Sequence, residues 1–141
     1  MSSLSQPIAR SRSTASAGPR KVAVVGAGYI SDSHLEVLKS IPGADLVAIV
    51  DSNAGRAEAK AKKWGAPRTY PDAAALLSGG GCDVAHVLVP PNLHRAVALP
   101  LLEAGVDVLL EKPMGVSAAE CAALNQAAAR GRALLGINQN F

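Results

Sequence analysis

The sequence predicts an α/β domain with a parallel sheet covered by helices on both faces, and three observations support this fold class. Short apolar runs rich in valine, isoleucine and leucine alternate with longer stretches in which apolar residues recur at helical spacing. The first of these runs, at residues 22–25, is continuously apolar, which is typical of a strand buried on both faces. Glycine or proline follows most of these segments and ends them.

The alternation yields six strands and five helices. The strands are predicted at residues 22–25, 46–50, 68–70, 84–89, 106–110 and 133–137. The helices are predicted at residues 30–41, 57–64, 72–77, 92–105 and 117–131. Because crossovers between parallel strands are right-handed, two such βαβαβ halves give a doubly wound sheet with strand order 3-2-1-4-5-6.

Local signals define several helix ends. Gly65 follows the second helix and suits the residue after its last turn. Asn92 follows two prolines and is predicted to cap the start of the fourth helix. Ser117 and Glu120 form a capping box for the fifth helix.

The composition limits what the chain can be. Its 141 residues suit one folded domain, and 49% hydrophobic with 18% charged residues exclude a disordered chain. No apolar run is long enough to cross a membrane. The net charge of +3 comes from the basic start of the chain and aromatic residues make up 3%, so we expect no nucleic-acid surface.

Cysteine and histidine usage predicts a chain with free thiols and no metal. Cys82 and Cys121 lie far apart, and the three histidines, His34, His86 and His94, show no ligand-like spacing. We therefore expect no metal site and a cytoplasmic location.

Residues 1–19 differ from the rest of the chain. They are rich in serine and arginine and hold little that could pack, so they are predicted to be a disordered tail. They lack the apolar segment of a secretory signal, although their composition also fits a transit peptide. The folded domain is expected to span residues 20–137.

A glycine-rich turn joins the first predicted strand to the first helix. Gly26 would allow the tight turn, and Gly28 would let the backbone approach a pyrophosphate. The N–H groups of Tyr29 and Ile30, at the positive end of the helix, would then bind the phosphates. Ser31 stands where glycine or alanine is usual, and its small side chain still permits close packing. The turn predicts a Rossmann-type dinucleotide site.

An acidic residue ends the second predicted strand, where dinucleotide-binding domains hold the adenosine ribose. Asp51 would accept hydrogen bonds from the ribose hydroxyls and repel the 2′-phosphate of NADP, so NAD is the preferred cofactor and NADP the second choice. A helix-capping role for Asp51 is the alternative. Arg56 could pair with a phosphate, but we interpret it as a solvated helix residue.

Two further clusters, at residues 90–94 and 111–113, follow the fourth and fifth strands. Each functional cluster therefore follows a strand, and the carboxyl edge of an open parallel sheet is where ligands bind. Lys112, next to Pro113, could contact a ribose hydroxyl or donate a proton to a substrate oxygen.

The charged and histidine side chains near these clusters also have plainer interpretations. Glu111 and Lys112 could be solvated loop charges, and His94 could cap or pack a helix. His86 falls in a buried strand and is interpreted as a core histidine, and His34 is assigned no role.

Together, the glycine turn, the aspartate after the second strand, the Pro-Pro-Asn-Leu-His loop and the Glu-Lys-Pro element resemble the Gfo/Idh/MocA oxidoreductase family, over residues from about 20 to 141. The resemblance implies that Lys112 is the catalytic residue, which contacts the nicotinamide ribose and assists proton transfer. The further cofactor contacts that it implies are Pro91, Asn92, His94, Glu111 and Pro113.

Members of that family carry a second α/β domain that supplies acid–base residues at the substrate site, and the resemblance implies that it is missing here. We therefore expect residues 138–141 to begin the crossover to an absent domain, and the chain to hold the cofactor of a sugar, cyclitol or nucleotide-sugar dehydrogenase without acting alone. A monomer is expected, because the missing domain often forms the dimer interface. The alternatives are a non-catalytic NAD(P)-binding module, such as a redox sensor, or a similar fold that binds S-adenosylmethionine.

Overall fold

The computed structural model describes residues 18–139. The strands are β1 (Arg20–Val25), β2 (Ala44–Val50), β3 (Arg68–Tyr70), β4 (Val84–Val87), β5 (Asp107–Glu111) and β6 (Leu135–Asn138). The helices are α1 (Ser31–Ser40), α2 (Ala54–Trp64), α3 (Ala73–Ser78), the 3₁₀ turn η1 (Pro91–Leu93), α4 (His94–Glu103) and α5 (Ala118–Gly131). The predictions made for residues 1–17 and 140–141 lie outside the described part of the chain.

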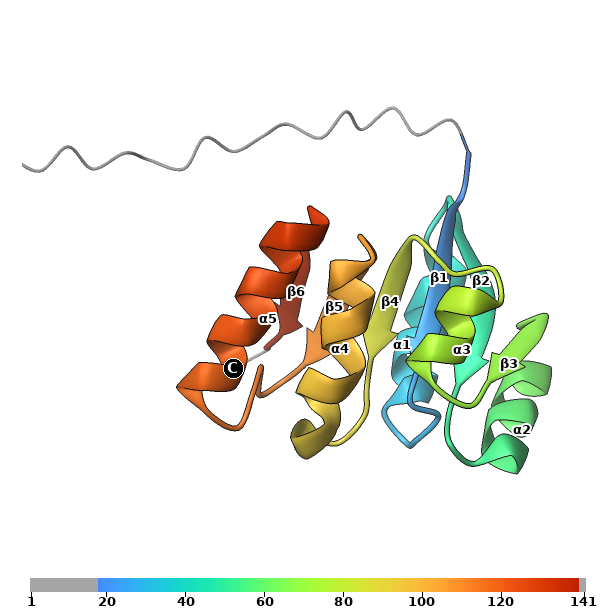
Figure 1. The fold of residues 1–141 in the computed structure, drawn as a ribbon. Helices are drawn as coiled ribbons and strands as arrows, with labels where there is room; N and C mark the ends of the chain where they lie inside the picture. The colour runs from blue at the N-terminus through green and yellow to red at the C-terminus, as the bar shows by residue number, and fades with distance from the viewer. Residues whose placement is uncertain (1–17, 140–141) are drawn as a thin grey trace, which may run out of the picture.

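The strands form a single parallel sheet in the order β3-β2-β1-β4-β5-β6, which confirms the predicted fold class and strand order. Helices α3, α4 and α5 cover one face of the sheet, and α1 and α2 pack on the other (Figure 1). The order reverses direction between β1 and β4. In open α/β sheets the carboxyl ends of the strands at this reversal form the ligand-binding crevice.

The start of α4 differs from the prediction. Asn92 is not the N-cap, because η1 precedes the helix and Leu93 occupies the capping position without a side-chain bond. The two prolines explain the difference: Pro91 suits a first turn, and the Leu93 N–H closes that turn on the carbonyl of Pro90 at 2.9 Å. Asn92 is therefore inside a turn rather than ahead of one.

The other helix ends agree more closely with the sequence. Gly65 ends α2 in the left-handed conformation, with φ +78°. Ser117 caps α5 by accepting a hydrogen bond from the Glu120 N–H at 3.2 Å. The Glu120 carboxylate returns to the N–H of Val116 rather than that of Ser117, so the capping box forms with a shift of one residue.

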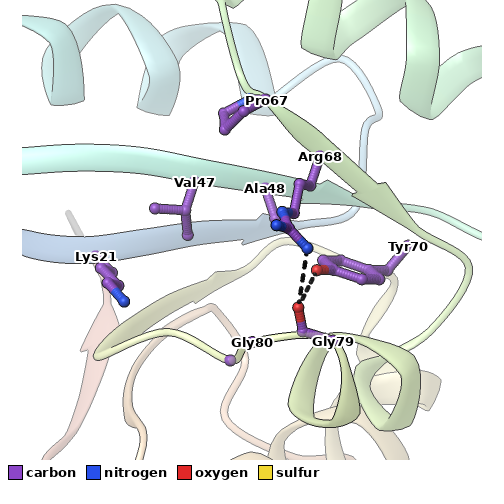
Figure 2. A pocket seen from close by; sticks show the side chains of 9 residues that line it. Lys21, Val47, Ala48, Pro67, Arg68, Tyr70, Gly79 and Gly80 are labelled. Atoms are coloured by element: carbon purple, nitrogen blue, oxygen red, sulfur yellow. Dashed lines mark hydrogen bonds between the residues drawn. The ribbon is translucent and has the colours of Figure 1, made fainter.

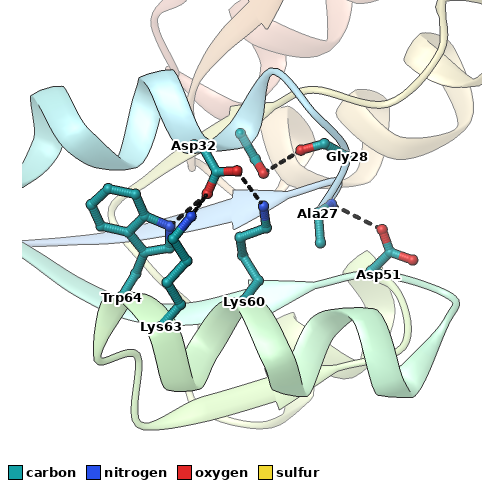
Figure 3. A network of polar contacts seen from close by, with 8 residues as sticks. Ala27, Gly28, Asp32, Asp51, Lys60, Lys63 and Trp64 are labelled. Carbon is teal, nitrogen blue, oxygen red and sulfur yellow. Dashed lines mark hydrogen bonds and ion pairs between the residues drawn. The ribbon is translucent and has the colours of Figure 1, made fainter.

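A polar network ties α1 to α2 (Figure 3). The Asp32 carboxylate accepts hydrogen bonds from Lys60 Nζ at 2.9 Å, from Trp64 Nε1 at 2.7 Å and from Lys63 Nζ at 3.4 Å. The hydrogen bonds from Lys60 and then Trp64 outweigh burial and lower the pKa of Asp32 to about 2. This network holds the helix that follows the glycine turn in place.

Replacing Asp32 with asparagine is expected to lower the free energy of unfolding by about 1 kcal/mol at pH 7, a value reduced for the partial exposure of the carboxylate. Since folding lowers this pKa, the contribution is present above about pH 4 and disappears as the pH falls toward 2. Thermal unfolding of both proteins between pH 2 and 7 would measure the effect. Asp45→Asn, at an exposed carboxylate on β2, is the control. A wild-type advantage that stayed constant down to pH 2 would contradict the assignment.

Candidate cofactor-binding site

A cleft of about 590 Å³ opens at the carboxyl edge of the sheet, across the point where the strand order reverses. Its volume lies within the range of small-molecule and cofactor sites. The sequence clusters that line it include Gly26, Gly28, Asp51, Arg56 and Glu111. The structure therefore brings the glycine turn, the end of β2 and the end of β5 into one cavity.

Gly26 is required by the fold itself. Its φ is +105°, and a Cβ atom there would lie 2.9 Å from the carbonyl carbon of Leu88. Its N–H donates to the carbonyl of Val50 at 2.7 Å. The turn after β1 is thus held between the ends of β2 and β4, and no larger residue fits there.

Gly28 is different, because within residues 18–139 no neighbouring atom lies within 4 Å of the position a Cβ would take. Protein packing does not explain a glycine at this position, which lines the cleft. Open space beside a bare backbone, at the start of α1, fits the close approach of a phosphate group. Tyr29 and Ile30 follow, with 94% and 39% of their surfaces exposed.

Ser31, the departure from the usual glycine pattern, is fully buried and its hydroxyl donates to the carbonyl of Gly28. The serine therefore stabilises the turn from within, and the close packing expected for a small third residue is present.

Asp51 is buried and already bonded within the protein. Oδ2 accepts the N–H of Ala27 at 2.9 Å (Figure 3), and Oδ1 accepts the N–H of Asn53 at 2.9 Å. Burial raises the pKa of Asp51, but the bonds from Ala27, Asn53 and Arg56 outweigh it and leave the pKa below its usual range. The carboxylate is therefore ionised at neutral pH, and Oδ2 keeps a lone pair for one further donor.

Arg56 forms an ion pair that the sequence did not predict. Its side chain is 55% exposed, yet its guanidinium pairs with Asp51 Oδ1 at 3.0 Å. The interpretation as a solvated helix residue is confirmed by this exposure. The ion pair forms because the start of α2 lies close enough to the end of β2 for the side chain to reach back. A cation thus lies beside the carboxylate in the cleft.

His94 has no exposed surface, and both ring nitrogens face backbone carbonyls. Nδ1 lies 2.8 Å from the Pro113 oxygen and Nε2 lies 2.9 Å from the Val89 oxygen. The ring joins the loop after β4 to the loop after β5 from inside the domain. This is the packing role that the sequence left open as an alternative.

The remaining predicted site residues lie on these two loops, outside the set that lines the cleft. Pro91 and Asn92 are exposed on η1, and Lys112 and Pro113 are exposed after β5. Glu111 is the member of its cluster that lines the cleft, with a side chain 18% exposed.

Sequence reasoning missed a histidine contact at Glu111. His34 on α1 places Nε2 2.8 Å from Glu111 Oε1, and its Nδ1 lies 2.9 Å from Nδ1 of His86 on β4. The alternation of side chains along β4 could have indicated this contact. Ala85 and Val87 are buried under α4, so His86, between them, lies on the opposite face of the sheet, which α1 covers.

A second hollow, of about 190 Å³, lies at the opposite edge, near the amino ends of β1 and β3 (Figure 2). Arg68 and Tyr70 both point to the Gly79 carbonyl there, with distances of 3.3 and 2.7 Å. Because it lies away from the carboxyl edge, we do not assign it to the cofactor.

Residues 18–139 contain no group of three histidine, cysteine, aspartate or glutamate side chains that could hold a metal ion. Over the same range, every helix is too short or too polar to cross a lipid bilayer.

The parallel sheet, the glycine turn and the cleft at the strand reversal define a dinucleotide-binding domain of the Rossmann class. A family model described as an oxidoreductase family with an NAD-binding Rossmann fold matches residues 20–139. The chain belongs to this family, the Gfo/Idh/MocA oxidoreductases, which confirms the resemblance inferred from the sequence.

Individual relatives agree. The chain is 32% identical over 121 residues to a D-apiose dehydrogenase of Paraburkholderia graminis, covering 86% of this chain and 32% of the relative. It is 36% identical over 103 residues to inositol 2-dehydrogenase 1 of Saccharopolyspora erythraea, covering 72% and 31%. An Agrobacterium radiobacter oxidoreductase, crystallised with NAD+, L-tartaric acid and magnesium, aligns with a TM-score of 0.81 at 27% identity, covering 86% and 36%. The chain spans about a third of the length of these relatives.

Proposed function

We propose that the chain binds NAD as the cofactor domain of a dehydrogenase that oxidises a hydroxyl group of a sugar or cyclitol. The observation that carries this proposal is the single cleft in which the open Gly28 backbone, the ionised Asp51 and Glu111 meet across the strand reversal. The D-apiose and inositol dehydrogenases among the relatives support the substrate class.

The two halves of the sheet would hold the two halves of the cofactor. Asp51, at the end of β2, would accept a hydrogen bond from the adenosine ribose through the free lone pair of Oδ2. The N–H groups at Gly28, Tyr29 and Ile30 would bind the pyrophosphate at the start of α1. The nicotinamide end would then lie toward β4 and β5, beside Glu111.

When bound, the cofactor accepts hydride at C4 of its nicotinamide ring, and the substrate hydroxyl loses a proton. Lys112, the exposed amine next to Glu111, would assist the transfer of that proton to solvent. Pro91, Asn92 and Pro113 would shape the two loops beside the cofactor, and His94 would hold these loops together from below.

Binding of NAD to purified Gly28→Ala protein tests the proposal. The added methyl group has room in the protein alone, so we expect unchanged thermal stability and an affinity for NAD reduced by about tenfold or more, as the methyl occupies phosphate space. Calorimetric titration with NAD and NADP would measure both affinities.

The matched control is Gly55→Ala, which adds a methyl at an exposed position of α2 outside the cleft. It should bind NAD as the wild type does. If the wild-type chain bound neither NAD nor NADP, or if Gly28→Ala bound NAD with unchanged affinity, the proposed cofactor site would be wrong.

A further inference from the structure

Four polar side chains from four different elements form a continuous hydrogen-bonded network at the edge of the cleft. His86 lies on β4, His34 on α1, Glu111 at the end of β5 and Asn138 at the end of β6. The contacts are 2.9 Å between the two Nδ1 atoms of the histidines, 2.8 Å from His34 Nε2 to Glu111 Oε1, and 2.6 Å from Asn138 Nδ2 to the same oxygen. Glu111 is the member of this network that lines the cleft.

The acceptors in this network determine which ring nitrogens of the two histidines carry a hydrogen. Burial raises the pKa of Glu111, but the hydrogen bonds from Asn138 and His34 outweigh it and the net pKa is lowered, so the group is a carboxylate at neutral pH. A carboxylate accepts only, so His34 Nε2 must carry a hydrogen. In its neutral form His34 then has a bare Nδ1, which accepts from the Nδ1–H of His86.

His86 is suited to pass a proton without keeping a charge. Burial, followed by the neighbouring His34, lowers its pKa to about 4, so it is neutral near pH 7. A proton that enters at His86 Nε2 allows the Nδ1 proton of His86 to move to His34 Nδ1. The net change is one proton gained by His34, while Glu111 keeps its hydrogen bond and His86 stays neutral.

The other charged groups around His34 are occupied elsewhere or exposed. On α1, Asp32 pairs with Lys60 and Lys63 of α2, and Glu36 and Lys39 are exposed. On β5, Asp107 pairs with Arg20 at the amino end of the strand. Lys112 lies exposed beyond Glu111. His86 and Glu111 are thus the titratable groups in direct contact with His34.

We propose that His34 is a positioning residue that holds the Glu111 carboxylate at the nicotinamide end of the cleft and gains a proton, through His86, when the bound cofactor is reduced. This inference rests on the proposed function. Oxidised nicotinamide carries a positive charge and the reduced ring is neutral, so reduction leaves Glu111 without a partner charge. A proton on His34 restores the balance.

The proton count agrees with the overall reaction. Oxidation of an alcohol gives a hydride to the cofactor and releases one proton, and His34 takes up one proton from solvent while the reduced cofactor stays bound. When the reduced cofactor leaves and an oxidised one binds, the positive ring replaces the charge on His34 and that proton is released. No further oxidant or reductant is needed.

Affinities of the 141-residue chain for NAD+ and NADH, measured from pH 5.5 to 8.5 by calorimetry and NADH fluorescence, test the inference across the range where histidines change charge. In the wild type, NADH should gain affinity relative to NAD+ as the pH falls, by about tenfold over this range and by no more than about tenfold per unit. In His34→Gln, whose amide can still donate to Glu111 but cannot take up a proton, the ratio should stay constant.

Three comparisons separate the possible results. His34→Ala should bind NAD+ more weakly than His34→Gln, because the glutamine restores the positioning contact. Nitrogen NMR shifts of labelled histidine should show protonation of the His34 ring on addition of NADH and not of NAD+. Glu36→Gln, on the exposed side of α1, is the control and should match the wild type.

If neither cofactor bound at any pH, the proposed function would fail and this inference with it. If both bound with a wild-type affinity ratio independent of pH, the proposed function would stand and the role of His34 would be refuted. The same conclusion would follow if the ratio in His34→Gln changed with pH as much as in the wild type.

Discussion

Replacing Gly131 with alanine is expected to destabilise the chain by about 3 kcal/mol, although glycine-to-alanine changes usually stabilise helices. Gly131 is the last residue of α5, and a Cβ atom built there would lie 1.7 Å from the carbonyl oxygen of Leu102 and 2.8 Å from its carbon. These are backbone atoms of α4, so no side chain can move aside. The two helices would have to separate.

Denaturant unfolding would measure the change in free energy. The reverse substitution at an exposed position of the same helix, Ala129→Gly, is the control and should cost about 1 kcal/mol through helix propensity alone. A Gly131→Ala protein as stable as the wild type would show that α4 and α5 do not approach each other this closely.

Replacing Asp51 with asparagine is expected to have the largest effect on cofactor choice. Without the negative charge beside the adenosine ribose, affinity for NADP relative to NAD should rise by about tenfold. Stability should fall by about 2 kcal/mol, because the buried carboxylate accepts the N–H groups of Ala27 and Asn53 and an amide oxygen replaces only part of these bonds. Parallel titrations with NAD and NADP, and a thermal melt, would measure both effects.

Arg56→Ala provides the opposite case at the same place in the cleft. It removes the cation but leaves the carboxylate, so NADP should bind still more weakly, while stability changes little because the arginine is half exposed. If the two variants changed the NADP-to-NAD ratio in the same direction, charge at this position would not govern the choice of cofactor.

The fold was predictable because its signals are local. Apolar runs and helical periodicity predicted the six strands, and β3 has the predicted bounds. The rules for doubly wound sheets then predicted the order of the strands. Strand ends were less predictable, since neighbouring elements compete for backbone groups. β6 begins at Leu135 rather than Ala133 because the Ala133 N–H closes the end of α5 on Ala128 and the Leu134 N–H bonds to the Asp107 side chain.

The sequence predicted which residues lie at the strand ends that form the candidate site, but it did not predict which side chains contact one another there. The turn at Gly26 and the position of Asp51 follow from rules about parallel sheets. The partners of Asp51 and Glu111 do not, because Arg56 and His34 reach them from helices whose distance from the sheet is set by packing. Alternation along β4 could have placed His86 toward α1, but the sequence was interpreted as giving a core histidine there.

The two contacts from the His94 ring to backbone carbonyls limit how the cofactor site could be redesigned. Since one buried ring joins the backbone at Val89 to the backbone at Pro113, an insertion or deletion in either loop would break a contact that supports the other. Loop grafting from a relative is therefore expected to succeed only when both loops and the histidine are transferred together. In the described part of the chain, the Asp51 carboxylate bonds to Ala27, Asn53 and Arg56 and not to these two loops, so this edge of the cleft is expected to tolerate separate variation.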